Sequence, residues 1–185
     1  GLTMGISVCL LIYLFIKHER SFDGYHRNAS DIFRVNSVFH EGGNDHELYA
    51  TPVPLASAIR NSVAGVQYTT LIRPLFRTVV EPSPHRLFKE ERMAIADADF
   101  FEVFDVALLH DDGQRPLSKP HQAILSQSTA RKFYGVDDPI GKTIKVKGKY
   151  EYTVAAVMAD PPANTSLPAT ILLSFADDDE LMDHG

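Results

Sequence analysis

The sequence predicts an α+β fold that follows an apolar N-terminal helix. The first observation is a run of sixteen residues, Gly1–Ile16, that contains no charged side chain. The second is a series of short runs of strand-forming residues bounded by turn residues, as in residues 142–158, which is typical of hairpins and sheets. The third is a pair of segments with helix start and stop signals, residues 51–65 and 126–135, which predict short helices between the strands.

The apolar run lacks the polar face that a surface helix of a soluble domain keeps. As a helix, residues 1–16 extend roughly 24 Å, whereas the hydrocarbon core of a bilayer is roughly 30 Å thick. We therefore interpret this run as the trailing part of a transmembrane helix whose earlier residues precede Gly1. Tyr13 lies near its end and the charged segment Lys17–Arg20 follows directly, an order typical of a membrane–water interface. The membrane-helix segment is thus expected to cover residues 1–19.

Two alternatives to a membrane helix stay open at this point. A helix buried in a soluble core can be equally apolar, although such helices usually carry a polar residue at the rim. The apolar region of a signal peptide has a similar length, but it follows a basic segment and precedes a small-residue cleavage site. Neither feature is visible around residues 1–20, so the membrane helix is the favoured interpretation.

The composition bounds the rest of the chain. The 185 residues carry a formal net charge of −6, with 44% hydrophobic and 23% charged residues, which is ordinary for a folded domain. Residues 20–185 are long enough for one domain or two small subdomains. The acidic balance and the lack of a basic stripe argue against a nucleic-acid partner. Cys9 is the only cysteine, so there is no disulfide framework.

Strand and turn signals organise the first half of the domain. We expect a polar connector at residues 20–31, with Phe22 and Tyr25 as anchors. A hairpin and a helix then follow, and two strands end this half. Their predicted ranges are strand 32–39, turn 40–46, strand 47–49, helix 51–65 with Thr51 as its cap and Gly65 at its end, strand 66–72, a break at Pro74, strand 75–80, and a close at Pro82 and Pro84.

The second half alternates strands with two short helices. Asp97–Phe104 is predicted as a helix capped by an aspartate, with Phe100 and Phe104 on one face because they are four residues apart. Ser126 is predicted to cap a helix over Gln127–Tyr134 that Gly135 ends. The remaining predictions are a strand region at 86–96, with a turn at 89–92 as the alternative for its centre, a polar turn region at 110–119, strands at 122–125, 142–147, 150–158 and 170–175, a hairpin turn at Gly148–Lys149, an extended loop at 160–166 and a solvated acidic terminus at 177–180.

Motifs for catalysis, cofactors or metals are not found. Gly141-Lys142-Thr143 ends like a phosphate-binding loop, but the glycine that this loop needs five residues earlier is replaced by Val136. His40, Glu41, Asp45 and His46 surround a glycine-rich turn without any zinc-type spacing, which indicates a solvated turn. We therefore assign no catalytic, cofactor-binding or metal-binding residue and expect no enzyme activity.

Several segments, taken in order, resemble bacterial ABC transporter permeases of the MacB/FtsX type. The apolar run is followed by Glu19-Arg-Ser-Phe-Asp-Gly-Tyr-His26 and Ala29-Ser-Asp-Ile-Phe-Arg-Val35. Further segments that look like the periplasmic core domain of this family are Ala98-Asp-Phe-Phe101, Ala123-Ile-Leu-Ser-Gln-Ser-Thr-Ala-Arg-Lys-Phe133, Asp138-Pro-Ile-Gly-Lys-Thr-Ile144, Tyr152-Thr-Val-Ala-Ala-Val157 and Asp160-Pro-Pro162. The resemblance covers nearly the whole chain.

The resemblance implies an architecture and a set of partners. Such permeases have four transmembrane helices, with a large periplasmic domain between the first and second. That domain has a porter-like part with βαβ units, here about 20–82 and 149–176, and an inserted strand-rich subdomain, here about 83–148. The implied partners are a second permease copy, a separate ATP-binding cassette subunit or domain, the bacterial inner membrane, and a periplasmic adaptor or lipoprotein. The domain would couple ATP-driven motion of the membrane helices to export or lipoprotein handling.

Two other functions remain as alternatives. An extracellular ligand-sensing domain of a membrane receptor would also combine a membrane helix with an α+β domain, but it would enclose a pocket with convergent polar groups. A membrane-tethered enzyme would need clustered titratable groups in a cleft. The sequence names neither the substrate nor the dimer interface, and the orientation in the membrane needs both flanks of the apolar run.

Overall fold

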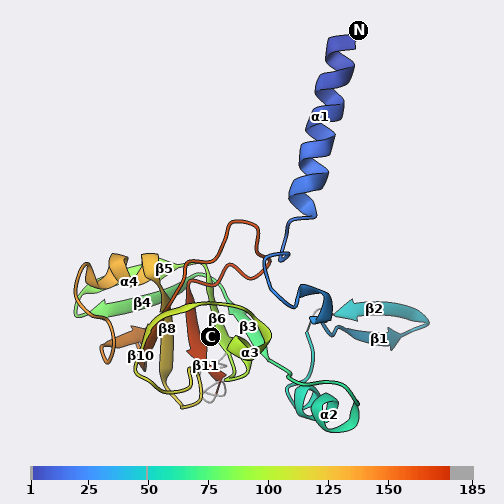
Figure 1. The fold of residues 1–185 in the computed structure, drawn as a ribbon. Coiled ribbons are helices and arrows are strands. Elements are labelled where there is room, and N and C mark those ends of the chain that lie inside the picture. Colours follow the sequence, from blue (N-terminus) through green and yellow to red (C-terminus); the bar gives the residue numbers. More distant parts are fainter. Residues whose placement is uncertain (1, 49, 176–185) are drawn as a thin grey trace.

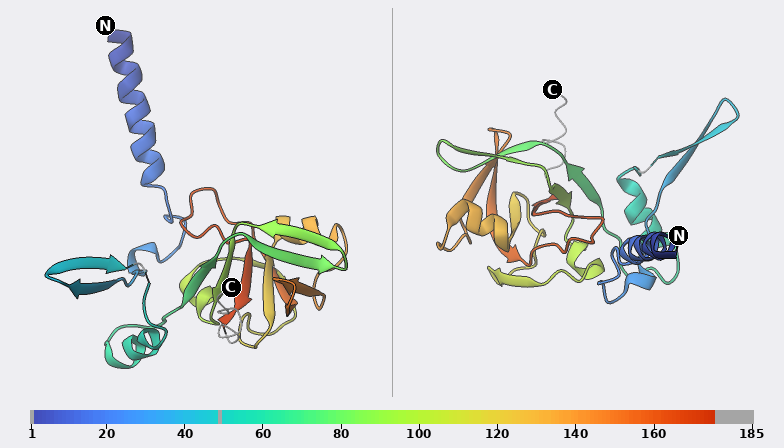
Figure 2. Two further views of the ribbon diagram at one scale, coloured as in Figure 1. Left: turned by 180° about the vertical axis from the view of Figure 1, so that it is seen from behind. Right: turned by 90° about the horizontal axis from the view of Figure 1, so that it is seen from above.

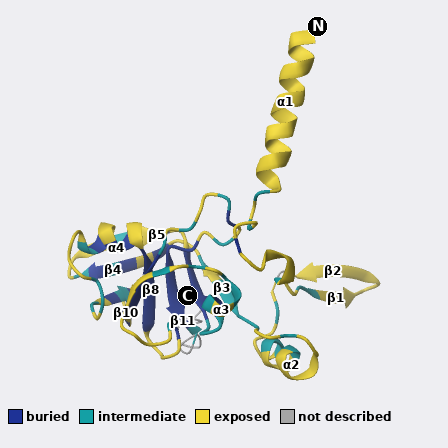
Figure 3. Ribbon diagram, viewed as in Figure 1, coloured by how far each residue is buried: buried dark blue, intermediate teal, exposed yellow. Residues whose placement is uncertain are grey.

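An isolated N-terminal helix and a separate β-sheet domain dominate the structure (Figure 1). The computed structural model describes residues 2–48 and 50–175, so the predicted acidic terminus at 177–180 lies outside the described residues. Helix α1 (Leu2–Glu19) points away from the domain, and none of its residues is buried (Figure 3). Within the described chain it is the one helix long and apolar enough to cross a membrane. The alternative of a buried core helix is therefore wrong.

The predicted mixed sheet is confirmed and contains nine strands among the described residues. Their order is β3-β6-β11-β8-β10-β9-β4-β5, and β7 pairs with β10 beside this path. The pairs β10–β8 and β11–β6 are parallel and the others antiparallel. The strands are β3 (Ile72–Leu75), β4 (Thr78–Ser83), β5 (Arg86–Glu90), β6 (Met93–Ala96), β7 (Leu108–Asp111), β8 (Gln122–Ser126), β9 (Thr143–Val146), β10 (Tyr150–Met158) and β11 (Ile171–Ser174).

The central strands bury side chains on both faces of the sheet. In β11, Ile171 and Leu173 pack in one core cluster and Leu172 packs in the other. Helix α4 (Gln127–Tyr134) adds Phe133 to the first cluster, and helix α3 (Phe100–Val103) adds Phe100 to the second. Strands covered on both sides need no polar alternation, which explains the continuous apolar runs of β6, β8 and β11.

The cap and the hairpin of the second half are confirmed. Ser126 accepts a hydrogen bond from the Thr129 N–H (3.3 Å), and Gly135 follows α4 with a φ of 68°. In β9, Ile144 and Val146 are buried, whereas Lys145 lies opposite Glu151 of β10. The turn between β9 and β10 spans residues 147–149, one residue longer than predicted.

Proline positions and helix ends account for most of the errors. Pro74 lies inside β3, opposite Ala94, and does not break a strand, because an edge strand has one side without ladder bonds. Pro82 likewise lies inside β4, where the register with β5 shifts. The predicted strand 66–72 is absent apart from Ile72. Helix α2 (Pro54–Ser62) begins after Val53, so Thr51 does not cap it.

Two further differences concern short elements. The N-terminal hairpin consists of β1 (Ser37–Glu41) and β2 (Asn44–Leu48), so its first strand begins five residues later than predicted. Strand β7 was not predicted, and its last two residues fall in the predicted polar turn region at 110–119. Helix α3 has a single turn preceded by Asp99, but Phe100 and Phe104 do share a face, with ring centroids 5.0 Å apart. The hairpin and α2 lie beside the sheet domain and outside its core (Figure 2).

Removal of residues 1–16 is expected to leave a folded domain. The residues of α1 contribute nothing to the buried core, so the free energy of unfolding of the sheet domain should not depend on them. Thermal unfolding followed by circular dichroism should show one cooperative transition for residues 17–185. A broad transition without cooperativity would mean that α1 belongs to the core.

Substitution of Ser126 by Ala is expected to lower the free energy of unfolding by about 1–2 kcal/mol, because the first turn of α4 loses its cap. The hydroxyl is fully buried and also donates to Thr129 Oγ1 (3.1 Å). Ser57→Ala in exposed α2 is the matched control and should change the free energy of unfolding by less than about 0.5 kcal/mol. Equal effects in urea unfolding would contradict the capping role.

Candidate functional site

The connector after α1 folds back onto one loop of the sheet domain. It begins with turns, in which Arg20 N–H donates to the Ile16 carbonyl (3.0 Å) and Ser21 N–H donates to the His18 carbonyl (3.0 Å). Asp23 then adopts a φ of 54°, a left-handed conformation that aspartate tolerates better than most residues. This turn brings the connector next to residues 160–167, the loop between β10 and β11 (Figure 1).

Asp23 is the centre of this contact. Its backbone N–H donates to the Asn164 carbonyl (3.0 Å). Its carboxylate accepts from the Ser166 N–H (2.9 Å), from the Ser166 hydroxyl and from the Thr165 hydroxyl (3.2 Å). In the opposite direction, the Asn164 side chain donates to the Ser21 carbonyl (2.7 Å). We call this set of contacts between residues 21–23 and 164–166 the connector clamp.

The hydrogen bonds of the clamp set the ionisation of Asp23. Partial burial raises the pKa of this carboxyl, but the bonds from Ser166 and Thr165 and the charge of His26 outweigh it. The net pKa of Asp23 therefore lies below its ordinary value of 3.8. The carboxylate of Asp23 is therefore ionised at neutral pH and can accept the hydrogen bonds that Thr165 and Ser166 donate to it.

Aromatic side chains that follow the clamp in the connector extend its contact with the sheet domain. The Tyr25 hydroxyl donates to Thr165 Oγ1 (2.9 Å). The His26 ring is buried between Tyr25 and Phe104, with centroid distances of 4.0 and 5.2 Å. Arg27 N–H donates to Asp105 Oδ2 (2.6 Å). The connector thus touches both the β10–β11 loop and the segment after α3.

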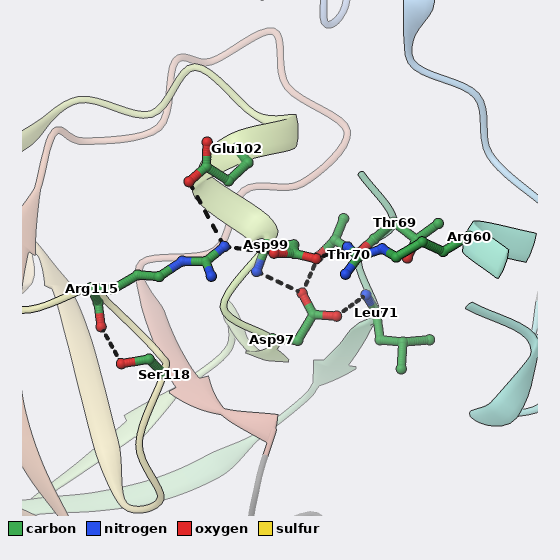
Figure 4. A network of polar contacts seen from close by, with 9 residues as sticks. All are labelled: Arg60, Thr69, Thr70, Leu71, Asp97, Asp99, Glu102, Arg115 and Ser118. Carbon is green, nitrogen blue, oxygen red and sulfur yellow. Dashed lines mark hydrogen bonds and ion pairs between the residues drawn. The ribbon is translucent and has the colours of Figure 1, made fainter. Parts of the chain in front are cut away.

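A second junction ties α2 to the segment around α3 (Figure 4). Arg60 of α2 and Arg115 both pair with the carboxylate of Asp99, the latter at 2.6 Å. Arg115 also lies 3.8 Å from Glu102. The neighbouring Asp97 accepts from the Thr70 hydroxyl (2.7 Å) and the Leu71 N–H (3.0 Å). Asp97 therefore holds the end of the α2–β3 linker, and it also accepts from the Asp99 N–H (3.2 Å) in the turn before α3, whose N-cap residue is Asp99.

In the hairpin of β1 and β2, the structure shows one contact among the residues considered as metal ligands, which are His40, Glu41, Asp45 and His46. His40 pairs with Asp45 across β1 and β2. Among the described residues, no group of three or more His, Cys, Asp or Glu side chains is arranged to hold a metal ion. Lys142 lies in the turn before β9 and not at the start of a helix, as expected for a chance match to the phosphate-binding motif.

Sequence reasoning identified neither side of the clamp as a contact. Of the two predicted anchors of the connector, Tyr25 bonds to Thr165 (2.9 Å), whereas Phe22 contacts the His18 ring (5.3 Å). Asp23 and the loop residues Asn164 and Ser166 were seen only as turn and loop residues. Both segments are rich in turn and loop residues, which indicated a turn in each of them. Nothing in the sequence, however, pairs two segments about 140 positions apart.

Comparisons with known proteins agree with this architecture. A sequence profile of the MacB-like periplasmic core domain matches residues 1–182. A search of curated proteins found no match. A solved domain assigned to a permease protein from Porphyromonas gingivalis is similar, with a TM-score of 0.64 and 23% identity. The periplasmic region of MacB from Actinobacillus actinomycetemcomitans gives a TM-score of 0.53 at 12% identity.

The likeness to these structures concerns the fold and part of their length. The matches cover 75% and 70% of this chain, but only 59% and 57% of the two solved chains. The profile match extends over almost the entire sequence, including α1 and the connector clamp. The chain therefore belongs to the MacB-like periplasmic core domain family of ABC transporter permeases.

Proposed function

We propose that this chain is the extracytoplasmic part of a permease subunit and that it couples motion of the membrane helix to work on a substrate or partner protein. The connector clamp is the observation that carries this proposal. It places at least four hydrogen bonds between the segment directly after α1 and the β10–β11 loop. A movement of the end of α1 is therefore passed to the sheet and not lost in a flexible linker.

The family supplies the context of the proposal. In it, the domain lies on the periplasmic side of the bacterial inner membrane, two permease copies form a dimer, and a separate ATP-binding cassette subunit or domain hydrolyses ATP. A periplasmic adaptor or lipoprotein is a further partner. The domain itself acts without catalytic residues, and its work is export or lipoprotein handling.

The subdomain division also remains a proposal. It places a porter-like part at about 20–82 and 149–176, and an inserted part at about 83–148. One sheet crosses these boundaries, because β9 pairs with β10 and β4 ends at Ser83. A porter-like unit of this kind would therefore share strands with the insertion and move with it.

Acid should loosen the clamp through Asp23. The folded-state pKa of this carboxyl is lowered, so its contribution is present above the unfolded pKa and is lost as the pH falls through the folded value. The protection of residues 21–27 from hydrogen exchange, relative to the intrinsic exchange rate at each pH, should therefore be high at neutral pH and fall below about pH 3.8. Asp23→Asn should show lower protection at neutral pH and little further change in protection on acidification. A wild-type pH profile in this variant would contradict the role of the carboxylate.

Coupling predicts an ATP-dependent movement of the domain. In the full transporter, a spin label at the fully exposed Val136, with Cys9 replaced by Ser, should report a change of the distance between two copies when ATP is added. Asp23→Ala should reduce this change while ATP hydrolysis persists. Asp31→Ala is the matched control, because this exposed carboxylate contacts only the neighbouring Ser30 hydroxyl in the hydrogen bonds described.

One result of this distance measurement would contradict the proposal. Identical distance distributions with and without ATP, in an active transporter, would mean that the domain does not take part in coupling. A protein without an ATP-binding cassette partner, continuing into a signalling module, would favour the ligand-sensing alternative.

A further inference from the structure

The loop between β10 and β11 is fastened at a second place, the first turn of α4. The N–H groups in the first turn of a helix have no partner inside the helix. In α4, the Ser126 hydroxyl accepts from the Thr129 N–H. The Ser128 N–H, by contrast, donates to the carboxylate of Asp160 (2.9 Å). Asp160 is the first residue of the loop, so the loop supplies part of the hydrogen bonding that caps α4.

The carboxylate of Asp160 suits this position. Partial burial raises the pKa of Asp160, but hydrogen bonds from Ser128 and Ser126 outweigh this effect. The charge of Arg131 acts in the same direction as these bonds, so the pKa of Asp160 lies below its ordinary value of 3.8. A negative charge is favourable at the N-terminal end of a helix, where the helix dipole is positive. The loop is therefore bound to α4 by a charge as well as by a hydrogen bond.

The other end of the loop returns to the same turn of α4. The carbonyl of Thr170, directly before β11, accepts from the Ser126 N–H (2.8 Å). Thr170 is buried, and its own N–H donates to the Arg92 carbonyl (2.8 Å). The tip between these two ends, residues 164–166, carries the connector clamp. A displacement of the tip therefore reaches the first turn of α4 through both arms of the loop.

Proline stiffens both arms of the loop. Pro161 and Pro162 follow Asp160 directly, and Pro168 lies between the clamp and Thr170. The proline ring fixes φ, and proline-rich segments act as semi-rigid spacers, whereas glycine- and serine-rich segments behave as flexible coils. The arms can therefore pass on a displacement that a flexible loop would absorb.

We propose that Asp160 is a positioning residue for the coupling: it fixes the β10–β11 loop to α4, so that a displacement of the connector moves α4. The inference rests on the proposed function, since it names the route by which motion of α1 reaches a helix of the sheet domain. Asp23 and Asp160 are then the two fastenings of one stiff loop, and loosening either of them loosens the other.

Two backbone amides report directly on the two fastenings. The Ser166 N–H donates to Asp23 (2.9 Å), and the Ser128 N–H donates to Asp160 (2.9 Å). In the full chain in detergent, NMR measures the protection of each amide from hydrogen exchange, relative to its intrinsic rate. Asp160→Ala should lower the protection of Ser166 about three- to tenfold, although it removes no bond of the clamp. Asp23→Ala should lower the protection of Ser128 by the same factor, because coupling between two sites is reciprocal.

Asp112 provides the matched control. This exposed carboxylate also accepts a backbone hydrogen bond, from Gln114 (3.0 Å), but in a turn outside the loop. Asp112→Ala should change the protection of neither Ser128 nor Ser166. The amides of β11 report on the sheet as a whole, since β11 lies between β6 and β8. They should keep their protection in all three variants.

A fourth variant tests the stiffness of the loop. Pro161→Gly combined with Pro162→Gly softens one arm and leaves both carboxylates in place. In this background, Asp23→Ala should lower the protection of Ser128 by a smaller factor than in the wild-type background. An unchanged factor would overturn the role of the prolines.

The remaining outcomes separate the route from the proposed function. Protection of Ser166 that is unchanged in Asp160→Ala, or that falls only together with the protection of β11, would overturn the route through Asp160. An equal loss in Asp112→Ala would overturn its specificity. In the full transporter, Asp160→Ala should reduce the ATP-dependent distance change at Val136, which lies just after α4. A change of wild-type size in this variant would overturn the route alone, whereas no change in the wild type would overturn the proposed function.

Discussion

The cover on both faces of the central strands is the constraint on which the domain depends. Strands β6, β8 and β11 bury successive side chains to opposite sides, so each face needs its own partner. Helix α4 covers one face, and α3 with the residues after it covers the other. Loss of either cover would expose strands that have no polar face, which is a state prone to aggregation.

Helix α1 is joined to this domain only through the connector. Helix α1 buries nothing, and the hydrogen bonds of the clamp join its end to the β10–β11 loop. That loop leads directly into β11, one of the most buried strands. The same connector also places the rings of Tyr25 and His26 next to Phe104, so the geometry of the clamp and the packing of these rings are linked.

Local signals predicted the parts of the fold that local chemistry decides. The Ser126 cap, the Gly135 stop and the alternation in β9 each depend on neighbours within a few residues, and all three are confirmed. Pro74 and Pro82 misled because the effect of proline depends on whether a strand lies at an edge or carries a register shift, which is tertiary information. The apolar run of residues 1–16 could be interpreted as an exposed, lipid-facing helix from the sequence because it lacks a polar face.

The contacts of the candidate site could be predicted from the sequence to a smaller extent than the elements of the fold. Asp23 and Ser166 meet only because the sheet brings the loop after β10 to the end of the domain nearest α1 (Figure 1). Similarly, Asp99 collects Arg60 and Arg115 from segments before and after it. Contacts of this kind follow from topology, whereas periodicity and turn residues report only on single segments.

The position of the β10–β11 loop has a mechanical consequence. Strand β10 is flanked by β8, β9 and β7, and β11 by β6 and β8, so a pull on α1 enters the sheet in its middle and not at its rim. Hydrogen bonds on both sides of the loaded strands then share the tension, and a rupture requires several of them to break together. A pull applied to the edge strand β5, by contrast, would break its hydrogen bonds with β4 one at a time. The sheet should therefore resist a pull through α1 better than a pull applied at its edge strand β5.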